Sequence, residues 1–118
     1  MALATDPRLV SYIAQTVDRT TRRVEATRNV TVLPSVRRLA EDVIAESLTV
    51  RAPEWQAREG IDVALPFNQN PAVDLAADRY ERVLNDAPPI DFQGQRVVTL
   101  RSFFESIVHN FCGIYPFC

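Results

Sequence analysis

The carboxyl-terminal segment 103–118 (FFESIVHNFCGIYPFC) is the feature that most constrains the fold of this chain. It contains four of the six phenylalanines of the sequence and a single charged side chain, that of Glu105. Chain ends are usually polar and poorly ordered unless something holds them in place. Because exposed apolar side chains cost free energy in water, we expect this end to be covered, either by the chain's own core or by another subunit.

The length and composition predict one globular domain. The chain has 118 residues, of which 47% are hydrophobic and 24% are charged. A domain of this size buries roughly two-thirds of the surface that its unfolded chain exposes, so a continuous core is feasible. We therefore expect a single domain over residues 1–118, with 113–118 as an apolar tail.

Helical periodicity and helix-end signals recur along the chain. We expect helices over 7–27, 36–50, 53–59, 71–85 and 100–112, because apolar residues recur there every three or four positions. Asp6-Pro7 and Asn70-Pro71 each place a capping side chain before a proline, which is typical of a helix start. Ser35 is the expected cap of the second helix, and Gly60 is the expected stop of the short one.

Strand signals are fewer and shorter. The segment 90–92, the turn Gln93-Gly94 and the segment 95–100 predict a β-hairpin. Segments 29–33 and 61–65 are further short strand candidates, and the first of them could instead be an extended link. The predicted fold class is α+β, mainly α, with four amphipathic helices, one short helix, a small β-hairpin and one or two short strands.

The last predicted helix carries the strongest apolar stripe in the chain. The stripe consists of Leu100, Phe103, Phe104, Ile107, Val108 and Phe111. We expect it to face the core, so that Phe104 is a core residue. The first helix has a similar expected stripe, which includes Val10.

The sequence offers only a weak metal-binding pattern. Glu105, His109 and Cys112 share one face of the last helix, and Cys118 could fold back towards them. Zinc motifs usually pair ligands from two elements at short spacings, which this arrangement lacks. We therefore expect no metal, no cofactor and no catalytic residue, with both cysteines reduced. A small enzyme or ligand-binding domain, with a pocket between the helices and the hairpin, is kept as an alternative.

Arginine supplies all the positive charge, because the sequence has no lysine. The candidate phosphate-binding residues are Arg19, Arg22, Arg23, Arg37 and Arg38. Acidic residues are interleaved with them, and the net charge is −2 with an isoelectric point near 5.3. A solvated face with local ion pairs is the favoured interpretation, and a nucleic-acid-associated regulator is the alternative.

Aromatic residues near the end of the chain suggest a protein interface, since aromatic side chains dominate interface energetics. The candidates are Phe111, Tyr115, Phe117 and Trp55. The leading hypothesis is a small interaction or assembly protein that self-associates or docks into a larger complex, either as a homo-oligomer or with another protein. A structural, adaptor or accessory subunit would fit this size.

The expected location follows from two absences in the sequence. The amino terminus lacks the pattern of a signal peptide, and no stretch has the 18 apolar residues of a membrane span. We expect a cytoplasmic protein, or a virion component if the source is a phage. Basic residues that are all arginine suggest a GC-rich coding background, hence a bacterium or its phage.

Overall fold

The computed structural model describes residues 6–61, 70–111 and 113–118 of the chain. Within these residues the fold comprises five helices and one three-stranded sheet. The elements are α1 (Pro7–Arg28), β1 (Thr31–Val32), α2 (Pro34–Thr49), α3 (Ala52–Glu59), α4 (Pro71–Asp86), β2 (Ile90–Phe92), β3 (Gln95–Val98) and α5 (Leu100–His109). The predicted α+β, mainly α, class is confirmed.

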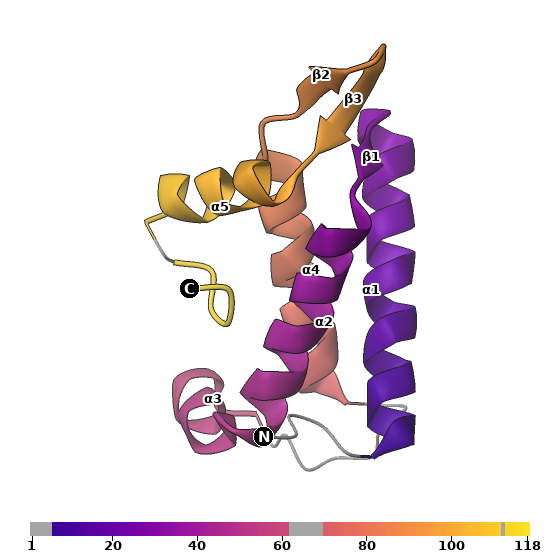
Figure 1. Cartoon of the computed structure of the whole chain (residues 1–118). Coiled ribbons are helices and arrows are strands. Elements are labelled where there is room, and N and C mark those ends of the chain that lie inside the picture. Colours follow the sequence, from indigo (N-terminus) through magenta and orange to yellow (C-terminus); the bar gives the residue numbers. More distant parts are fainter. Residues whose placement is uncertain (1–5, 62–69, 112) are drawn as a thin grey trace.

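Three long helices form the body of the molecule. Helix α1 packs against both α2 and α4, and α2 also contacts α4. Helix α5 lies across one end of α4, and the β2–β3 hairpin projects beyond it (Figure 1). Helix α3 lies at the opposite end of the body, and the carboxyl-terminal tail lies on the same side as α3 and α5 (Figure 1). The fold therefore leaves one side of α5 without a neighbouring helix among the described elements.

The helix starts follow the capping signals in two cases of three. The Asp6 side chain accepts a hydrogen bond from the Arg8 amide, and Asn70 accepts from the amides of Ala72 and Val73. The expected cap at Ser35 is wrong. Helix α2 begins two residues earlier than predicted, at Pro34, because the fixed φ of proline suits the first helical position even without a side-chain cap.

Helix α5 is shorter than predicted. Thr99 caps its start by accepting a hydrogen bond from the Ser102 amide. The helix ends at His109 rather than at 112, because Asn110 takes the cap position and Phe111 then turns into the left-handed region with φ of 54°.

The sheet joins two distant parts of the chain in the order β1-β3-β2. Strand β1 pairs in parallel with β3, so that Thr31 lies opposite Val97, while β2 and β3 form the antiparallel hairpin. Gln93 and Gly94 both have positive φ, as the tight turn requires. The strand expected over 61–65 falls, except for Ile61, outside the described residues.

One hydrophobic core unites the helices. Its largest fully buried side chains are those of Trp55, Tyr80, Tyr115 and Phe103. Four residues that were expected to face the core are exposed instead, and these expectations are wrong: Val10 on α1, and Phe104, Val108 and Phe111 of the last predicted helix. Successive helical residues are about 100° apart. Phe103 and Ile107 therefore point into the core, while Phe104 and Val108 point away from it.

Candidate functional site

The apolar tail is covered by the chain's own core. The Tyr115 ring stacks on Trp55 with ring centroids 5.0 Å apart, and neither residue is more than 2% exposed. Phe117 is also buried, with its ring 5.8 Å from that of Phe103. These three interface candidates are therefore enclosed within the monomer. Of the four predicted residues, only Phe111 remains on the surface.

Arginines hold the tail from outside. The guanidinium groups of Arg51 and Arg58 lie 4.6 and 4.4 Å from the centre of the Tyr115 ring. Arg79 donates to the Tyr115 carbonyl oxygen at 2.9 Å and makes two hydrogen bonds to the Glu59 carboxylate, at 2.7 and 3.0 Å. The hydrogen bonds from Arg79 hold the pKa of Glu59 below its ordinary value. This arrangement fastens the tail to α3 and α4, and it serves the fold.

Three large exposed apolar side chains lie on α5 or just beyond its end. Phe104 is 50% exposed, Val108 is 70% exposed, and Phe111, just beyond the end of the helix, is 92% exposed. We call these three residues the α5 face. Phe104 and Val108 line a shallow, mostly apolar hollow whose remaining walls are Arg101, Glu105 and His109. Clusters of exposed apolar residues rimmed by polar ones often mark interaction sites.

Phe111 has an uncommon backbone conformation for its residue type. Its φ of 54° lies in the left-handed region, which glycine and asparagine adopt most easily. An ordinary side chain there costs roughly 1 kcal/mol or more. The Phe111 ring gains almost no burial in return, since it is nearly fully exposed. The monomer fold alone gives no reason for an aromatic residue at this position.

The surface beside the α5 face continues towards the hairpin. A second hollow lies between them, lined by Pro88, Pro89, Ile90, Thr99, Arg101, Ser102 and Glu105. Arg101 and Glu105 line both hollows and form an ion pair at 3.3 Å. Ile90 and Phe92 of β2 are also about half exposed. Further apolar surface is thus available next to the α5 face.

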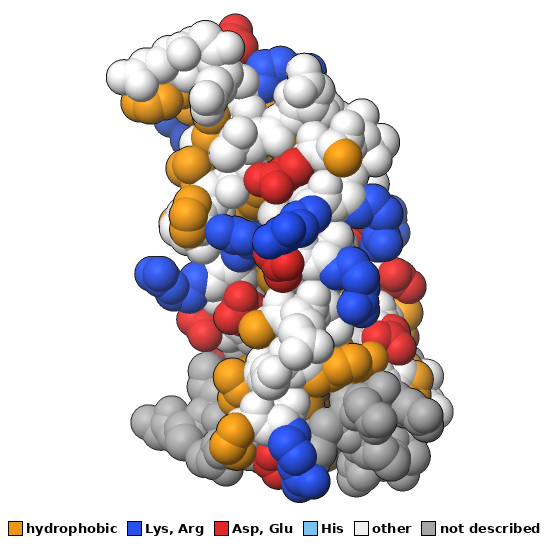
Figure 2. Space-filling view, turned by 90° about the vertical axis from the view of Figure 1, so that its right-hand side faces the viewer, with side chains coloured by type: hydrophobic (Ala, Val, Ile, Leu, Met, Phe, Trp, Pro, Cys, Tyr) orange, Lys and Arg blue, Asp and Glu red, His pale blue; other side chains and the backbone are white. Residues whose placement is uncertain are grey.

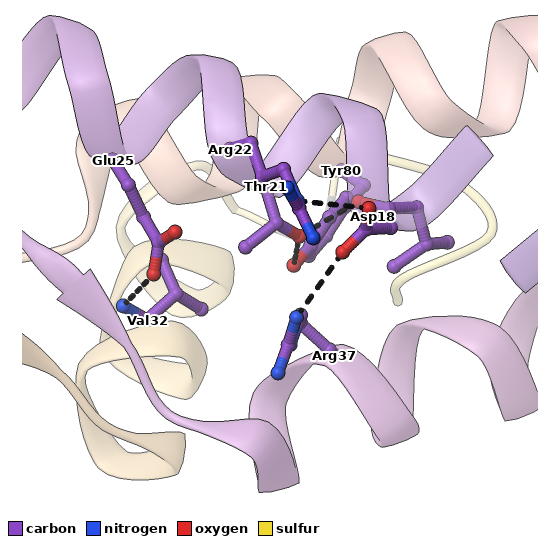
Figure 3. Close-up of polar contacts among 8 residues, drawn as sticks. Asp18, Thr21, Arg22, Glu25, Val32, Arg37 and Tyr80 are labelled. Atoms are coloured by element: carbon purple, nitrogen blue, oxygen red, sulfur yellow. Dashed lines mark hydrogen bonds and ion pairs between the residues drawn. The ribbon is translucent and has the colours of Figure 1, made fainter. Parts of the chain in front are cut away.

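The predicted phosphate-binding arginines are mostly engaged by acids. Asp18 accepts from Arg22 at 2.9 Å and from Arg37 at 3.3 Å, as Figure 3 shows. Arg23 makes two hydrogen bonds to Glu81, at 2.8 and 2.9 Å. The side of the molecule formed by α1 shows acidic and basic side chains interleaved rather than a basic stripe (Figure 2).

Two of those arginines stand apart. Among the described residues, no ion pair involves Arg19 or Arg38. Arg38 lines a polar hollow between α1 and α2 together with Arg37, Asp18 and Glu41, so acids and bases balance there. The α1–α2 surface therefore carries little net positive potential.

The metal candidates do not form a site in the described part of the chain. No group of three or more histidine, cysteine, aspartate or glutamate residues is close enough there to hold a metal ion. Cys118 is disulfide-bonded, so the expectation of reduced cysteines is wrong for this residue. A metal-binding cysteine must be a free thiolate, which excludes Cys118 in this state. Cys112 lies outside the described residues.

Two polar contacts inside the helical body serve the fold. The Thr21 and Tyr80 hydroxyls lie 2.7 Å apart, and the Glu25 carboxylate accepts from the Val32 amide at 2.9 Å (Figure 3). Burial raises the pKa of Tyr80 to about 12.

A polar hollow lies beside the hairpin. Its described lining residues include no carboxylate and no imidazole; they are Asn29, Val30, Thr31, Gly94, Gln95 and Arg96. Neither these buried contacts nor this hollow supplies an acid–base pair among the described residues.

The described residues define a mainly helical α+β domain in which, among these residues, no element covers the α5 face. No described helix is long and apolar enough to cross a membrane. The chain matches no family model, no curated protein and no solved structure. Any function must therefore be argued from the chain's own residues.

Proposed function

We propose that this chain is a small interaction or assembly protein whose contact surface is the α5 face. The observation that carries the proposal is the exposure of three large apolar side chains on α5 and just beyond its end, those of Phe104, Val108 and Phe111. The exposed part of these side chains adds nothing to the stability of the monomer, whereas its burial on association is favourable. The sequence suggested association through the carboxyl-terminal helix and the tail. Because Tyr115 and Phe117 of the tail are buried within the monomer, we propose the helix side alone as the contact surface.

The conformation of Phe111 supports the same proposal. A left-handed position favours glycine or asparagine, yet this one carries a nearly fully exposed aromatic ring. Aromatic residues at the centre of an interface supply a large share of the binding energy. The Phe111 ring costs the monomer free energy and is almost unburied among the described residues. Binding of this ring to another molecule would explain why an aromatic residue stands here.

The alternatives have less support. Phosphate binding by the α1–α2 arginines would require Arg22, Arg23 and Arg37 to leave their ion pairs with acidic residues. A domain of net charge −2 also lacks the overall positive field that draws nucleic acid to a protein. Enzymatic function would need acid–base groups that converge in an enclosed site. The hollow of the α5 face has Glu105 and His109 in its walls, but it is shallow and mostly apolar.

The proposal also includes where the protein resides. Disulfides persist in oxidising surroundings, including virion surfaces, and are rare in the cytoplasm. Of the two locations expected from the sequence, a virion component therefore suits the disulfide-bonded Cys118 better. A structural or accessory role in an assembly is consistent with both the location and the α5 face.

Site-specific photo-crosslinking tests the proposal. A photoreactive phenylalanine analogue is placed at Val108 in the full chain, within the cells that produce it. The matched control carries the analogue at Val10, which is apolar and exposed to a similar degree as Phe104 but lies on α1. We expect a discrete crosslinked protein product from position 108 and none from position 10. Equal yields from both positions, or no product from position 108, would refute the α5 face as a binding surface.

A further inference from the structure

We propose that the partner of the α5 face is a second copy of this chain, with the two α5 helices packed antiparallel about a two-fold axis. The inference rests on the proposed function, since it names the occupant of the same surface. Homo-oligomers most often use two-fold interfaces, in which the same patch on both copies must be complementary to itself. The residues of α5 meet that requirement in their spacing and in their charge.

The spacing of the exposed residues is symmetric along the sequence. Arg101, Phe104, Val108 and Phe111 are separated by steps of three, four and three residues. Arg101, Phe104 and Val108 lie along one side of α5 and can form a seam with another helix, and Phe111 follows just beyond the end of α5 at His109. Because the order of steps is the same in both directions, an antiparallel copy brings Phe104 opposite Val108 of the second copy, and Val108 opposite Phe104.

The charges beside the seam are also self-complementary. In the antiparallel arrangement, Arg101 reaches the end of the second helix, where Phe111 is exposed. A guanidinium over an aromatic ring is favourable, and the same contact forms twice in a two-fold dimer. Arg101 and Glu105 are already paired within each copy, so no uncompensated like charges meet. Antiparallel packing also brings the positive end of each helix dipole towards the negative end of the other.

The exposed area sets the strength of this contact. Taking about 200 Å² for a phenylalanine side chain, Phe104 and Phe111 together leave roughly 280 Å² exposed on each copy. Val108 adds to this area, and Ile90 lines the neighbouring hollow. Standard interfaces bury about 1,200–2,000 Å² in total. The α5 face therefore supports a small interface, and we expect a micromolar or weaker dissociation constant rather than a permanent dimer.

Sedimentation equilibrium of the purified full chain tests the inference. The concentration runs from about 1 μM to about 500 μM, which brackets micromolar dissociation constants. We expect the mass to rise from the monomer value of 13.3 kDa towards twice that value. Phe111→Asn should weaken dimerisation by about tenfold or more. The folded monomer should not lose thermal stability, because asparagine accepts the left-handed conformation.

Two further variants keep the test specific. Val108→Glu places an acid in the seam and should also prevent dimerisation, whereas Val10→Glu on α1 should leave it unchanged. A photoreactive residue at Phe104 should label the peptide that contains Val108 of the second copy. Labelling of the Phe104 peptide instead would overturn the antiparallel geometry.

The failures of the two proposals are distinguishable. A mass of 13.3 kDa at all concentrations, or a dimer that neither α5 substitution weakens, would overturn the second copy as occupant. If position 108 still crosslinks a different protein in cells, the α5 face remains a binding surface with another partner. If the chain stays monomeric and position 108 gives no crosslink, both proposals fail.

Discussion

Replacing the adjacent phenylalanines of α5 one at a time separates core from surface. Phe103 is fully buried, with ring contacts to Tyr80 and Phe117 at centroid distances of 5.9 and 5.8 Å. Deleting such a ring costs about 3–5 kcal/mol in lost transfer free energy and cavity formation. Phe104 is only half buried, so about 100 Å² of its side chain is at stake, worth about 2.5 kcal/mol at most.

The net effect of Phe104→Ala should be smaller still. Alanine retains part of the buried area, and it favours a helix more than phenylalanine does by about 0.5 kcal/mol. We therefore expect Phe104→Ala to lower the free energy of unfolding by about 1 kcal/mol and Phe103→Ala to lower it by about 3 kcal/mol or more. The difference is a large part of the total stability of a domain this size, which is about 5–15 kcal/mol.

Equilibrium urea unfolding followed by tryptophan fluorescence measures both values, because Trp55 is buried in the core. The two variants serve as each other's control, since they differ only in which of two neighbouring rings is removed. Measurements at low micromolar concentration reduce any contribution from self-association. A Phe104→Ala variant that loses as much stability as Phe103→Ala would refute the orientation of α5 described here.

Three further results are expected. Because burial raises the pKa of Tyr80 from 10.0 to about 12, the contribution of Tyr80 to stability should be complete below pH 10 and fall by about 2–3 kcal/mol towards pH 12. Tyr80→Phe should make the alkaline loss of stability smaller in pH-dependent unfolding, and the raised pKa values of Tyr12 and Tyr115 should leave a remainder. Arg79→Ala should cost about 2 kcal/mol in urea unfolding, because it breaks partly buried charged hydrogen bonds to Glu59. Arg101→Ala, which breaks an exposed ion pair, should change the free energy of unfolding little. Cys118 should resist iodoacetamide, by mass spectrometry, until the protein is reduced.

Local signals in the sequence predicted the elements well. The paired signals Asp6-Pro7 and Asn70-Pro71 mark the starts of α1 and α4 because capping and a fixed proline φ act within a few residues. Gly60 ends α3 in the left-handed conformation for an equally local reason. These features need no knowledge of the rest of the fold, so the sequence alone can predict them.

The side of α5 that faces the core could not be predicted in the same way. Its apolar stripe runs through Phe103, Phe104, Ile107 and Val108, and it is wider than the contact that α4 provides. Which half of the stripe is buried depends on where α4 lies, and α4 is distant in the sequence. The exposure of Val10 on α1 has the same origin. Periodicity identifies an apolar stripe but not how much of it a neighbouring element covers.

The residues that bury the carboxyl-terminal tail could not be predicted from the sequence either. Trp55 lies sixty residues before Tyr115, and Arg79 joins the tail to Glu59 of α3. No local spacing signals a contact between such distant positions. The sequence correctly required that something must cover the tail, but left open whether the cover was the chain itself or a partner.

The carboxyl-terminal segment therefore contains two kinds of apolar residue with different roles. Tyr115 and Phe117 are satisfied within the monomer, so replacing them would damage the fold and say nothing about partners. Phe111 is in the opposite situation, because its ring has almost no burial to lose and its backbone would favour asparagine or glycine. A substitution that leaves the monomer as stable as before while abolishing association is possible only at a residue of this second kind. Phe111 is thus the position where the fold and the proposed interaction can be tested separately.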